Sequence, residues 1–292
     1  MSDTKSGGTL STALLTTLAM LAFAGNSLLC RIALRDTAID AANFTAIRLA
    51  SGALILAAIL MLRGKRPTAG GSWPMAAMLF AYAVCFSFAY RDLTAATGAL
   101  LLFGAVQLTM MGYGLWTGER IGGLRLMGLL LALGGLVWLL LPGLAAPPWL
   151  EAALMLAAGA AWGVYSLLGK DSGDPIAATG GNFLRTLPFA AVLVLAATTI
   201  MTLGGTVDRP VDHMGALYAV LSGAVTSGLG YVLWYAALPM LKATSAATVQ
   251  LCVPAIAALG GAVLLAEPVT ARLVVASVAI LGGIALTIRA KG

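Results

Sequence analysis

Two stretches of the chain decide how it folds: 124-LRLMGLLLALGGLVWLLL-141 and 271-ARLVVASVAILGGIALTI-288. Each carries one arginine near its start and is otherwise almost wholly apolar. A helix of roughly 20 apolar residues crosses the hydrocarbon core of a bilayer, which is about 30 Å thick. The whole chain is 60% hydrophobic and 10% charged, against roughly 45–50% and 25% in a soluble domain. The sequence therefore predicts an integral membrane protein.

Apolar runs of this kind recur along all 292 residues, bounded by charge, proline or glycine. We predict an all-α integral membrane protein with ten transmembrane helices, near 10–30, 41–62, 74–91, 94–117, 124–141, 150–169, 176–203, 214–237, 243–265 and 271–288. The connections are short, and the longest lie around 64–73 and 204–213.

The basic residues favour one orientation, because cytoplasmic loops of membrane proteins are enriched in Lys and Arg. With the amino terminus inside, ten of the 17 basic residues fall on the cytoplasmic side and five on the outer side. The outer five are Arg31, Arg35, Arg91, Arg209 and Arg272. We expect a multi-pass protein of the cell (inner) membrane with both termini in the cytoplasm. The net charge of +6 comes without a basic stripe, so nucleic-acid binding is not expected.

The amino terminus resembles a cleavable signal in one respect, since Ala22-Phe23-Ala24 ends an apolar run that follows Lys5. The uncharged run from 7 to 30 is longer than a usual signal core, so we expect it to remain as a permanent helix.

The cysteines Cys30, Cys85 and Cys252 lie far apart inside apolar segments without metal-ligand spacing. We interpret them as small buried hydrophobic residues and expect no cofactor and no metal.

An internal repeat organises the chain. Leu133-Gly134-Gly135 matches Leu281-Gly282-Gly283 at an offset of 148, and Glu119 matches Glu267 at the same offset. Earlier in each half Arg48 meets Arg185 at a shorter offset. We therefore divide the chain into a first five-helix repeat, 1–145, and a second, 146–292.

Five crossings are an odd number, so two similar halves enter the bilayer in opposite senses. Many secondary transporters use such inverted repeats and bind their substrate at the interface of the halves. The expected architecture is two inverted five-helix repeats around a central cavity.

These features resemble the drug/metabolite transporter (DMT) superfamily, in its ten-helix EamA-type branch, over essentially the whole chain. The resemblance rests on the tandem halves, on Trp162-Gly163 followed by Lys170, and on Pro254 followed by Ala266-Glu267-Pro268. In the first half Ala24 replaces the usual Trp and Val106 stands opposite Pro254. The chain looks most similar to the YddG-type exporters of aromatic amino acids. The resemblance implies a basket of helices, with the second and seventh peripheral to the cavity.

Aromatic side chains form the first group of candidate substrate-binding residues. Tyr82, Phe86 and Tyr90 recur every four residues and share one helix face. Further rings lie in the fourth, sixth and eighth spans. Rings can stack on a planar ligand, although simple helix packing explains the same pattern. The full set of aromatic candidates is Tyr82, Phe86, Tyr90, Phe103, Trp162, Tyr165, Tyr231 and Trp234.

Amides form the second group. Asn26, Gln107 and Gln250 lie inside apolar spans, where an unpaired amide is costly. They must face protein or water, so each either contacts substrate or forms an interhelical hydrogen bond. Gln250 precedes Pro254 by four residues, and a proline there frees the carbonyl of residue 250 as an acceptor.

Charged residues at span ends and within spans form the third group. We assign Glu119, Glu267 and Pro254 to gates, while a helix cap or a loop ion pair is the alternative for the glutamates. Arg48 and Arg185 lie inside their spans, where a central arginine costs roughly 2.5–3.5 kcal/mol. We favour a structural role for both, because the resemblance makes their helices peripheral.

The sequence thus predicts a secondary transporter, not an enzyme, that exports small amphipathic metabolites, aromatic or other neutral amino acids, by alternating access. None of the eleven acidic residues falls near mid-span, which favours facilitated diffusion. A broad drug/metabolite exporter with proton coupling is the alternative, and a channel or scaffold is a further one. Partners are the lipid bilayer and a small molecule, and a monomer is compatible with the sequence.

Overall fold

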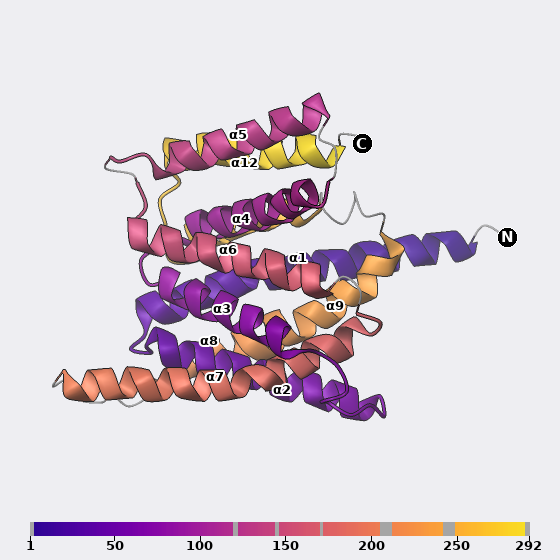
Figure 1. Cartoon of the computed structure of the whole chain (residues 1–292), viewed down its shortest axis with the longest axis vertical. Helices are drawn as coiled ribbons and strands as arrows, with labels where there is room; N and C mark the ends of the chain where they lie inside the picture. Colours follow the sequence, from indigo (N-terminus) through magenta and orange to yellow (C-terminus); the bar gives the residue numbers. More distant parts are fainter. Residues whose placement is uncertain are drawn as a thin grey trace.

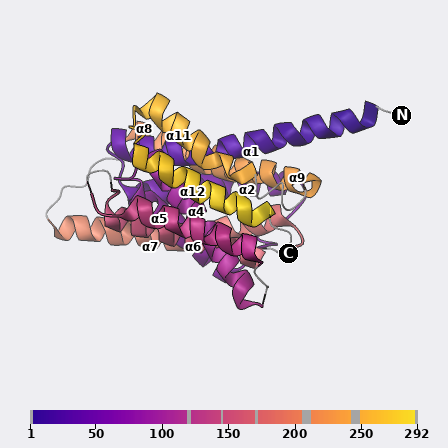
Figure 2. The same cartoon turned by 90° about the horizontal axis from the view of Figure 1, so that it is seen from above.

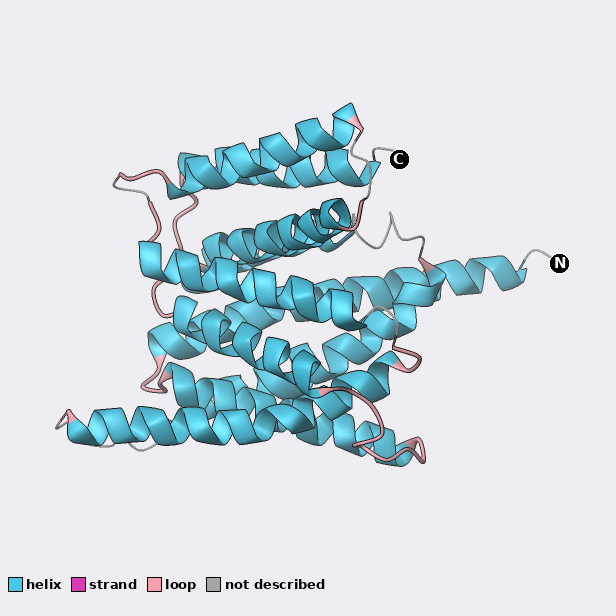
Figure 3. Cartoon of the chain, in the orientation of Figure 1, coloured by secondary structure: helices cyan, strands magenta, loops and turns pink. Residues whose placement is uncertain are grey.

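A computed structural model of the chain describes residues 3–118, 122–143, 146–169, 172–204, 212–241 and 249–289. Within these ranges every regular element is a helix and no strand is present (Figure 3). The all-α prediction is confirmed for this part of the chain.

The helices follow one another with short connections. In chain order they are α1 (Asp3–Asp36), α2 (Ala41–Leu62), α3 (Trp73–Ala89), α4 (Ala95–Trp116), α5 (Gly123–Leu140), α6 (Trp149–Gly169), α7 (Pro175–Leu203), α8 (His213–Val220), η1 (Leu221–Leu229), α9 (Gly230–Ala237), η2 (Leu238–Met240), α11 (Cys252–Leu265) and α12 (Ala271–Arg289). The elements α8, η1, α9 and η2 form one continuous helical segment.

Length and composition fit membrane crossing. Among the described residues, six helical segments are long and apolar enough to span a bilayer. They are Thr12–Asp36, Ala41–Leu62, Ala95–Trp116, Trp149–Gly169, Pro175–Leu203 and His213–Met240. Four shorter apolar helices accompany them, Trp73–Ala89, Leu126–Leu140, Cys252–Leu265 and Ala271–Thr287. The protein is therefore a multi-pass membrane protein.

Side-chain caps set several helix ends. Asp40 accepts hydrogen bonds from the backbone N–H groups of Ala42 and Asn43 at the start of α2. Ser72 caps α3 and Thr94 caps α4 in the same way. The predicted end of the first span at residue 30 is wrong, since α1 continues to Asp36. Nothing in the sequence between those points stops a helix, because Gly and Pro are absent there.

The helices lie roughly parallel and antiparallel in a stack (Figure 1). The pair α5 and α12 covers one side, the pair α2 and α7 covers the opposite side, and α1, α3, α4, α6 and α9 lie between. The beginning of α1 and the end of α12 lie at the same end of the bundle. The first turns of α1 extend beyond the other helices, as the second view also shows (Figure 2).

Small residues let α6 lie close to α4. A side chain added at Gly159 would meet the carbonyl oxygen of Leu102 at 2.6 Å, and one at Gly163 would meet Cβ of Thr109 at 2.9 Å. The Gly159-x-x-x-Gly163 spacing thus gives a close contact between the two helices. The similar pattern ending at Gly118 makes no such contact, because Gly118 lies beyond α4 with φ of 90° and open space around it.

The outer surface of the bundle is apolar and carries tryptophans near its ends. Trp116 closes α4 and is 86% exposed, and Trp149 opens α6 and is 80% exposed. They lie at opposite ends of the bundle, where aromatic belts meet the membrane interfaces. Long apolar side chains such as Leu62 and Val263 are also exposed. In a bilayer this surface faces lipid.

The α4–α6 contact gives a first prediction. Gly159→Ala should lower the stability of the detergent-solubilised protein by about 1–3 kcal/mol, because its Cβ would force a backbone carbonyl away. Gly112→Ala is the matched control on α4, since open space surrounds that position and alanine favours the helix. Thermal unfolding midpoints in detergent measure both changes. Equal midpoints for the two variants would contradict this account of the contact.

Candidate functional site

A chain of aromatic rings runs through the middle of the bundle. The indole of Trp162 on α6 stacks on the ring of Tyr231 on α9 with 5.3 Å between centroids and on Tyr165 at 5.3 Å. On its other side Trp162 meets Tyr82 of α3 at 5.0 Å, and Tyr82 meets Phe86 at 5.3 Å. We call these five residues the ring cluster. It brings together predicted site residues from both halves of the sequence.

Further rings border the ring cluster. Phe23 of α1 lies 5.9 Å from Tyr231 and 6.1 Å from Trp234, and Phe183 of α7 lies 6.2 Å from Tyr231. Trp234 is therefore joined to the cluster through Phe23, as an outer member. All of these contacts are tilted or edge-to-face, which suits the charge distribution of aromatic rings.

Asn26 of α1 ties the polar part of the site together. Its amide Nδ2 donates to the hydroxyl of Tyr82 at 3.3 Å. Its Oδ1 accepts from the hydroxyl of Ser222 at 2.7 Å and from that of Thr226 at 3.5 Å. The amide is thus satisfied by interhelical bonds, which were one of the two expectations for this residue.

A π-helix presents the hydroxyl groups that Asn26 and Arg48 use. Between Leu221 and Leu229 the eighth apolar segment forms η1, a π-helix. The wider turn points Ser222, Thr226 and Ser227 toward α1 and α2. Gly223 fits against Arg48, because any side chain there would collide with the carbonyl oxygen of Arg48. Segments of π-helix are rare in proteins, and those that occur are often found at functional sites.

Arg48 of α2 lies directly beside the ring cluster. It is 2% exposed, and its guanidinium carbon lies 4.8 Å from the ring centroid of Phe86 and 5.2 Å from that of Tyr82. Nη2 donates to the hydroxyl of Tyr82 at 3.0 Å, and Nε donates to that of Ser227 at 3.4 Å. The structural role predicted for this arginine rested on α2 being peripheral, but α2 packs against η1 as well as α7, and this places Arg48 beside the ring cluster.

The charge of Arg48 is incompletely satisfied. Its Nη1 is buried and has no hydrogen-bond partner among the residues that the structure describes. The ion pairs found in those residues do not include Arg48. Cation–π contacts with two rings offset part of the cost of burial.

Glu267 closes the bundle at the end opposite the chain termini. Its Oε1 accepts from Nε of Arg31 at 2.9 Å, and its Oε2 accepts from the backbone N–H of Ala95 at 2.8 Å. Arg31 also donates to the carbonyl oxygens of Tyr90 and Arg91. We call this group the end contact. It joins α1, the end of α3, the start of α4 and the segment after α11, so Glu267 makes the ion pair and helix cap named as the alternative, and its role as a gate stays a prediction.

Arg185 anchors the loop between α2 and α3. Its Nη1 donates to the carbonyl oxygens of Gly70 at 2.7 Å and Gly181 at 2.9 Å. Next to it, Asn182 accepts from the backbone N–H of Ser72 and donates to the hydroxyl of Tyr165 at 3.2 Å. Arg185 therefore has the structural position predicted for it, and Asn182 links the loop to the ring cluster.

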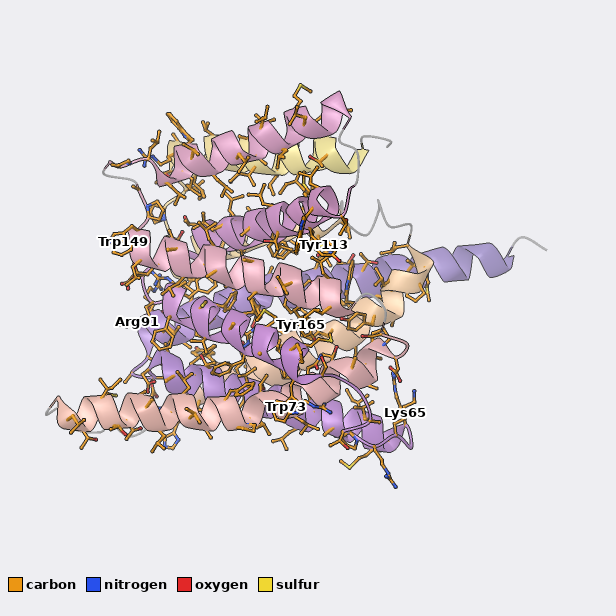
Figure 4. All side chains as sticks on the ribbon, viewed as in Figure 1. Lys65, Trp73, Arg91, Tyr113, Trp149 and Tyr165 are labelled. Carbon is orange, nitrogen blue, oxygen red and sulfur yellow. The ribbon has the colours of Figure 1, made fainter. Side chains whose placement is uncertain are left out.

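An exposed ion pair lies at the same end of the bundle as that loop. Lys65 after α2 donates to the carboxylate of Asp174, which also caps α7 through the N–H groups of Ile176 and Ala177. The ammonium group of Lys65 and these two N–H groups hold the pKa of Asp174 below its ordinary value. Lys65 lies at one end of the bundle and Arg91 and Trp149 at the other, with Tyr165 between them (Figure 4).

The remaining candidates lie outside the ring cluster. The hydroxyl of Tyr90 donates to the carbonyl oxygen of Ala95 at 3.3 Å and its ring meets Phe86 edge-on, so it packs beside the end contact. Phe103 is buried and Gln107 half-buried on α4, and in the described part of the chain no hydrogen bond or ring contact joins either to the cluster.

Three predicted residues belong to the ninth span and to the connection between α4 and α5. Gln250 is half-buried just ahead of α11. Pro254 lies in the first turn of α11, where its missing N–H is not needed. Glu119 lies outside the described residues.

Several contributors were missed by sequence reasoning. Arg31, Ser222 and Thr226 were not assigned, and neither were Phe23 and Phe183. The spacing of four between Ser222 and Thr226 places both hydroxyls on one helix face and offered a signal. Among the described residues no group of three or more His, Cys, Asp and Glu side chains is arranged to hold a metal.

Comparison with known proteins agrees with this architecture. The sequence profile of the EamA-like transporter family matches residues 149–289. A Pseudomonas aeruginosa protein, "Uncharacterized protein PA1977", is 60% identical over 276 residues, which cover 94% of this chain and 93% of that protein. An "Uncharacterized transporter" of Archaeoglobus fulgidus is 29% identical over 177 residues, 59% of this chain and 60% of that protein.

One solved crystal structure has the same fold. It superposes with a TM-score of 0.62 at 19% identity, and the match covers 95% of this chain and 97% of the other.

The apolar helical bundle is that of a multi-pass membrane protein, and the EamA-like match over residues 149–289 places it among membrane transporters. Residues 149–289 form an EamA-like transporter domain, of the drug/metabolite transporter superfamily.

The end contact gives a second prediction. Glu267→Gln and Arg31→Gln should each destabilise the protein by about 3–5 kcal/mol, because each leaves a nearly buried charge unpaired. The double variant should lose less than the sum, with a coupling energy of about 0.5–3 kcal/mol. Asp36→Asn is the control, since its pair with Arg35 is exposed and worth less than about 1 kcal/mol. Strict additivity in unfolding measurements would show that Arg31 and Glu267 do not interact.

The exposed pair gives a third prediction. A lowered pKa means that the folded state favours the charged carboxylate, so this stabilisation is present above about pH 4 and is lost as the pH falls further. Asp174→Asn keeps an oxygen for the cap and removes only the charge, so it should cost less than about 1 kcal/mol at pH 7.

Asp174→Ala removes the cap as well and should cost about 1 kcal/mol more. Unfolding midpoints of wild type and Asp174→Asn should converge as the pH drops below about 4. A difference that persists unchanged at low pH would contradict the ionic origin of the contact.

Proposed function

We propose that the protein is a secondary transporter that exports small amphipathic metabolites, with aromatic and other neutral amino acids as the first candidates. One observation carries the proposal: the ring cluster and Asn26 gather stacking faces and hydrogen-bonding groups from α1, α3, α6 and α9 in the bundle interior. Pockets for small molecules combine apolar walls with a few convergent polar groups.

We infer that the chain crosses the inner membrane ten times, as two inverted halves at 1–145 and 146–292, with both termini in the cytoplasm. Reciprocal packing supports this. The helices α3 and α4, from the first half, pack on α6 of the second half. In the same way α8, η1, α9 and α11, from the second half, pack on α1 of the first half. The family match to residues 149–289 is about the length of the second half.

Alternating access gives the two ends of the bundle their roles in this proposal. The end contact of Arg31, Glu267 and Ala95 forms the closed outer gate. The exposed pair of Lys65 and Asp174 forms a weaker contact on the cytoplasmic side. We propose Glu119 as the counterpart of Glu267, with Pro254 and Gln250 at the break ahead of α11, which lets that helix tilt against α4.

The mechanism that we propose is facilitated diffusion. The carboxylates that the structure describes lie at helix ends or in connections, as Glu267 and Asp174 do, and not beside the ring cluster. A proton-coupled exporter needs a titrating group along the substrate path.

Transport by the purified protein in proteoliposomes tests the proposal. Counterflow of labelled tryptophan or phenylalanine should saturate and should be inhibited by other aromatic amino acids. Trp162→Ala should reduce the rate by at least about tenfold, since it removes three ring contacts at roughly 0.5–1.5 kcal/mol each. Trp116→Ala is the matched control, because its ring is 86% exposed at the end of α4 and should leave transport unchanged.

The outcomes separate the competing functions. Non-saturating flux without competition would indicate a channel. Counterflow that collapses when the proton gradient is removed would contradict facilitated diffusion. If aromatic amino acids are not moved while unrelated metabolites are, the substrate assignment is wrong and the transporter assignment stands.

A further inference from the structure

We propose that Arg48 is the anchor for a carboxylate group of the substrate, so that the site takes carboxylates with an apolar or aromatic body and does not require an ammonium group. This inference rests on the proposed function and names the chemical class of its substrate. Its basis is a buried guanidinium that is only partly satisfied beside the ring cluster.

The hydrogen bonds of Arg48 leave some of its donors without a partner in the described part of the chain. A guanidinium has five N–H donors, and those of Nη1 have no partner among the described residues. Nη2 gives one donor to Tyr82 at 3.0 Å, and Nε gives its donor to Ser227 at a long 3.4 Å. The two oxygens of a carboxylate match the fork formed by Nη1 and the second N–H of Nη2. A neutral carbonyl can take only part of this fork.

The charges around Arg48 also favour a carboxylate ligand. The groups that face it are the hydroxyls of Tyr82 and Ser227 and the ring of Phe86, with Tyr231 and the thiol of Cys30 nearby. None of these is a carboxylate. An unbalanced positive charge in an apolar interior is costly, and a bound anion compensates it.

The position of Arg48 directs the rest of the ligand. A carboxylate on the fork of Nη1 and Nη2 lies next to Tyr82, to which Nη2 donates at 3.0 Å, and Tyr82 contacts Trp162 at 5.0 Å, so the body of the ligand meets the ring cluster. An ammonium group placed there would find Asn26 and hydroxyl oxygens as acceptors and no acidic side chain among the described contacts. The ammonium group of an amino acid therefore adds little to binding.

A set of three ligands that share a phenylethyl body tests the proposal without any variant. The probes are 3-phenylpropionate, 3-phenylpropanamide and phenethylamine, added to the purified wild-type protein in detergent. We expect 3-phenylpropionate to raise the unfolding midpoint and to bind at least roughly tenfold more tightly than the amide or the amine, since a charge-assisted hydrogen bond is lost in both. Phenylalanine should bind about as well as 3-phenylpropionate.

Variants then identify the residue. Arg48→Gln should abolish the preference for the carboxylate, and Arg48→Lys should keep a weaker preference because a charge remains without the fork. Arg185→Gln is the matched control, since Nη1 of Arg185 already donates to Gly70 and Gly181, and it should leave the preference unchanged.

The outcomes are distinct for the two proposals. Equal shifts with all three ligands, no shift with 3-phenylpropionate at millimolar concentration, or an unchanged preference in Arg48→Gln would each overturn the anchor. If Arg48→Gln does not fold, the wild-type comparison still decides. Carboxylate binding without transport in proteoliposomes would refute the proposed function and leave the anchor in place.

Discussion

A guanidinium group inside an apolar bundle is the constraint on which the interior of this protein depends. An arginine at the centre of a membrane helix costs roughly 2.5–3.5 kcal/mol on insertion scales, so its surroundings must offset that cost. Arg48 meets the ring faces of Phe86 and Tyr82 and donates to two hydroxyl groups. The π-helix η1 supplies the hydroxyl of Ser227, and the hydrogen bond from Asn26 fixes the orientation of the hydroxyl of Tyr82. The aromatic and polar parts of the site are thus one structure.

Hydrophobic runs were sufficient to predict the helices. Eight of the described helical segments follow predicted spans closely, because apolar length and bounding charge dictate where a helix can cross a bilayer. The exceptions have local causes. The first span continues to Asp36 because no helix-breaking residue precedes it, and α11 begins at Cys252, two residues ahead of Pro254.

The site could be predicted only in part. Spacings of three and four residues placed Tyr82 and Phe86 on one face, and the structure confirms that they touch. The position of Arg48 depends on how α2 packs against η1, which no helix period shows. A π-helix also changes the face on which Ser222 and Ser227 lie, and the sequence gives no signal for it. The packing of the helices decides which side chains meet between them, and the periodicity within one helix does not specify that packing.

The two ends of the bundle differ in the strength of their contacts. Arg31 and Glu267 are nearly buried, with side chains 11% and 7% exposed, and they also bind backbone groups of α3 and α4. Lys65 and Asp174 are much more exposed, so water screens their interaction. In the proposed transport cycle, the end of the bundle where the chain termini lie is therefore the easier one to open.

Access of water to the ring cluster from one side at a time is the central claim, and cysteine labelling at position 162 tests it most directly. Trp162→Cys in a chain whose Cys30, Cys85 and Cys252 are replaced would be exposed to a membrane-impermeant thiol reagent from either face of sealed vesicles. We expect labelling from the face of the chain termini, and faster labelling from the opposite face when Glu267→Gln is added. The account would be contradicted by equal labelling from both faces, with and without the Glu267→Gln substitution, or by no labelling from either face.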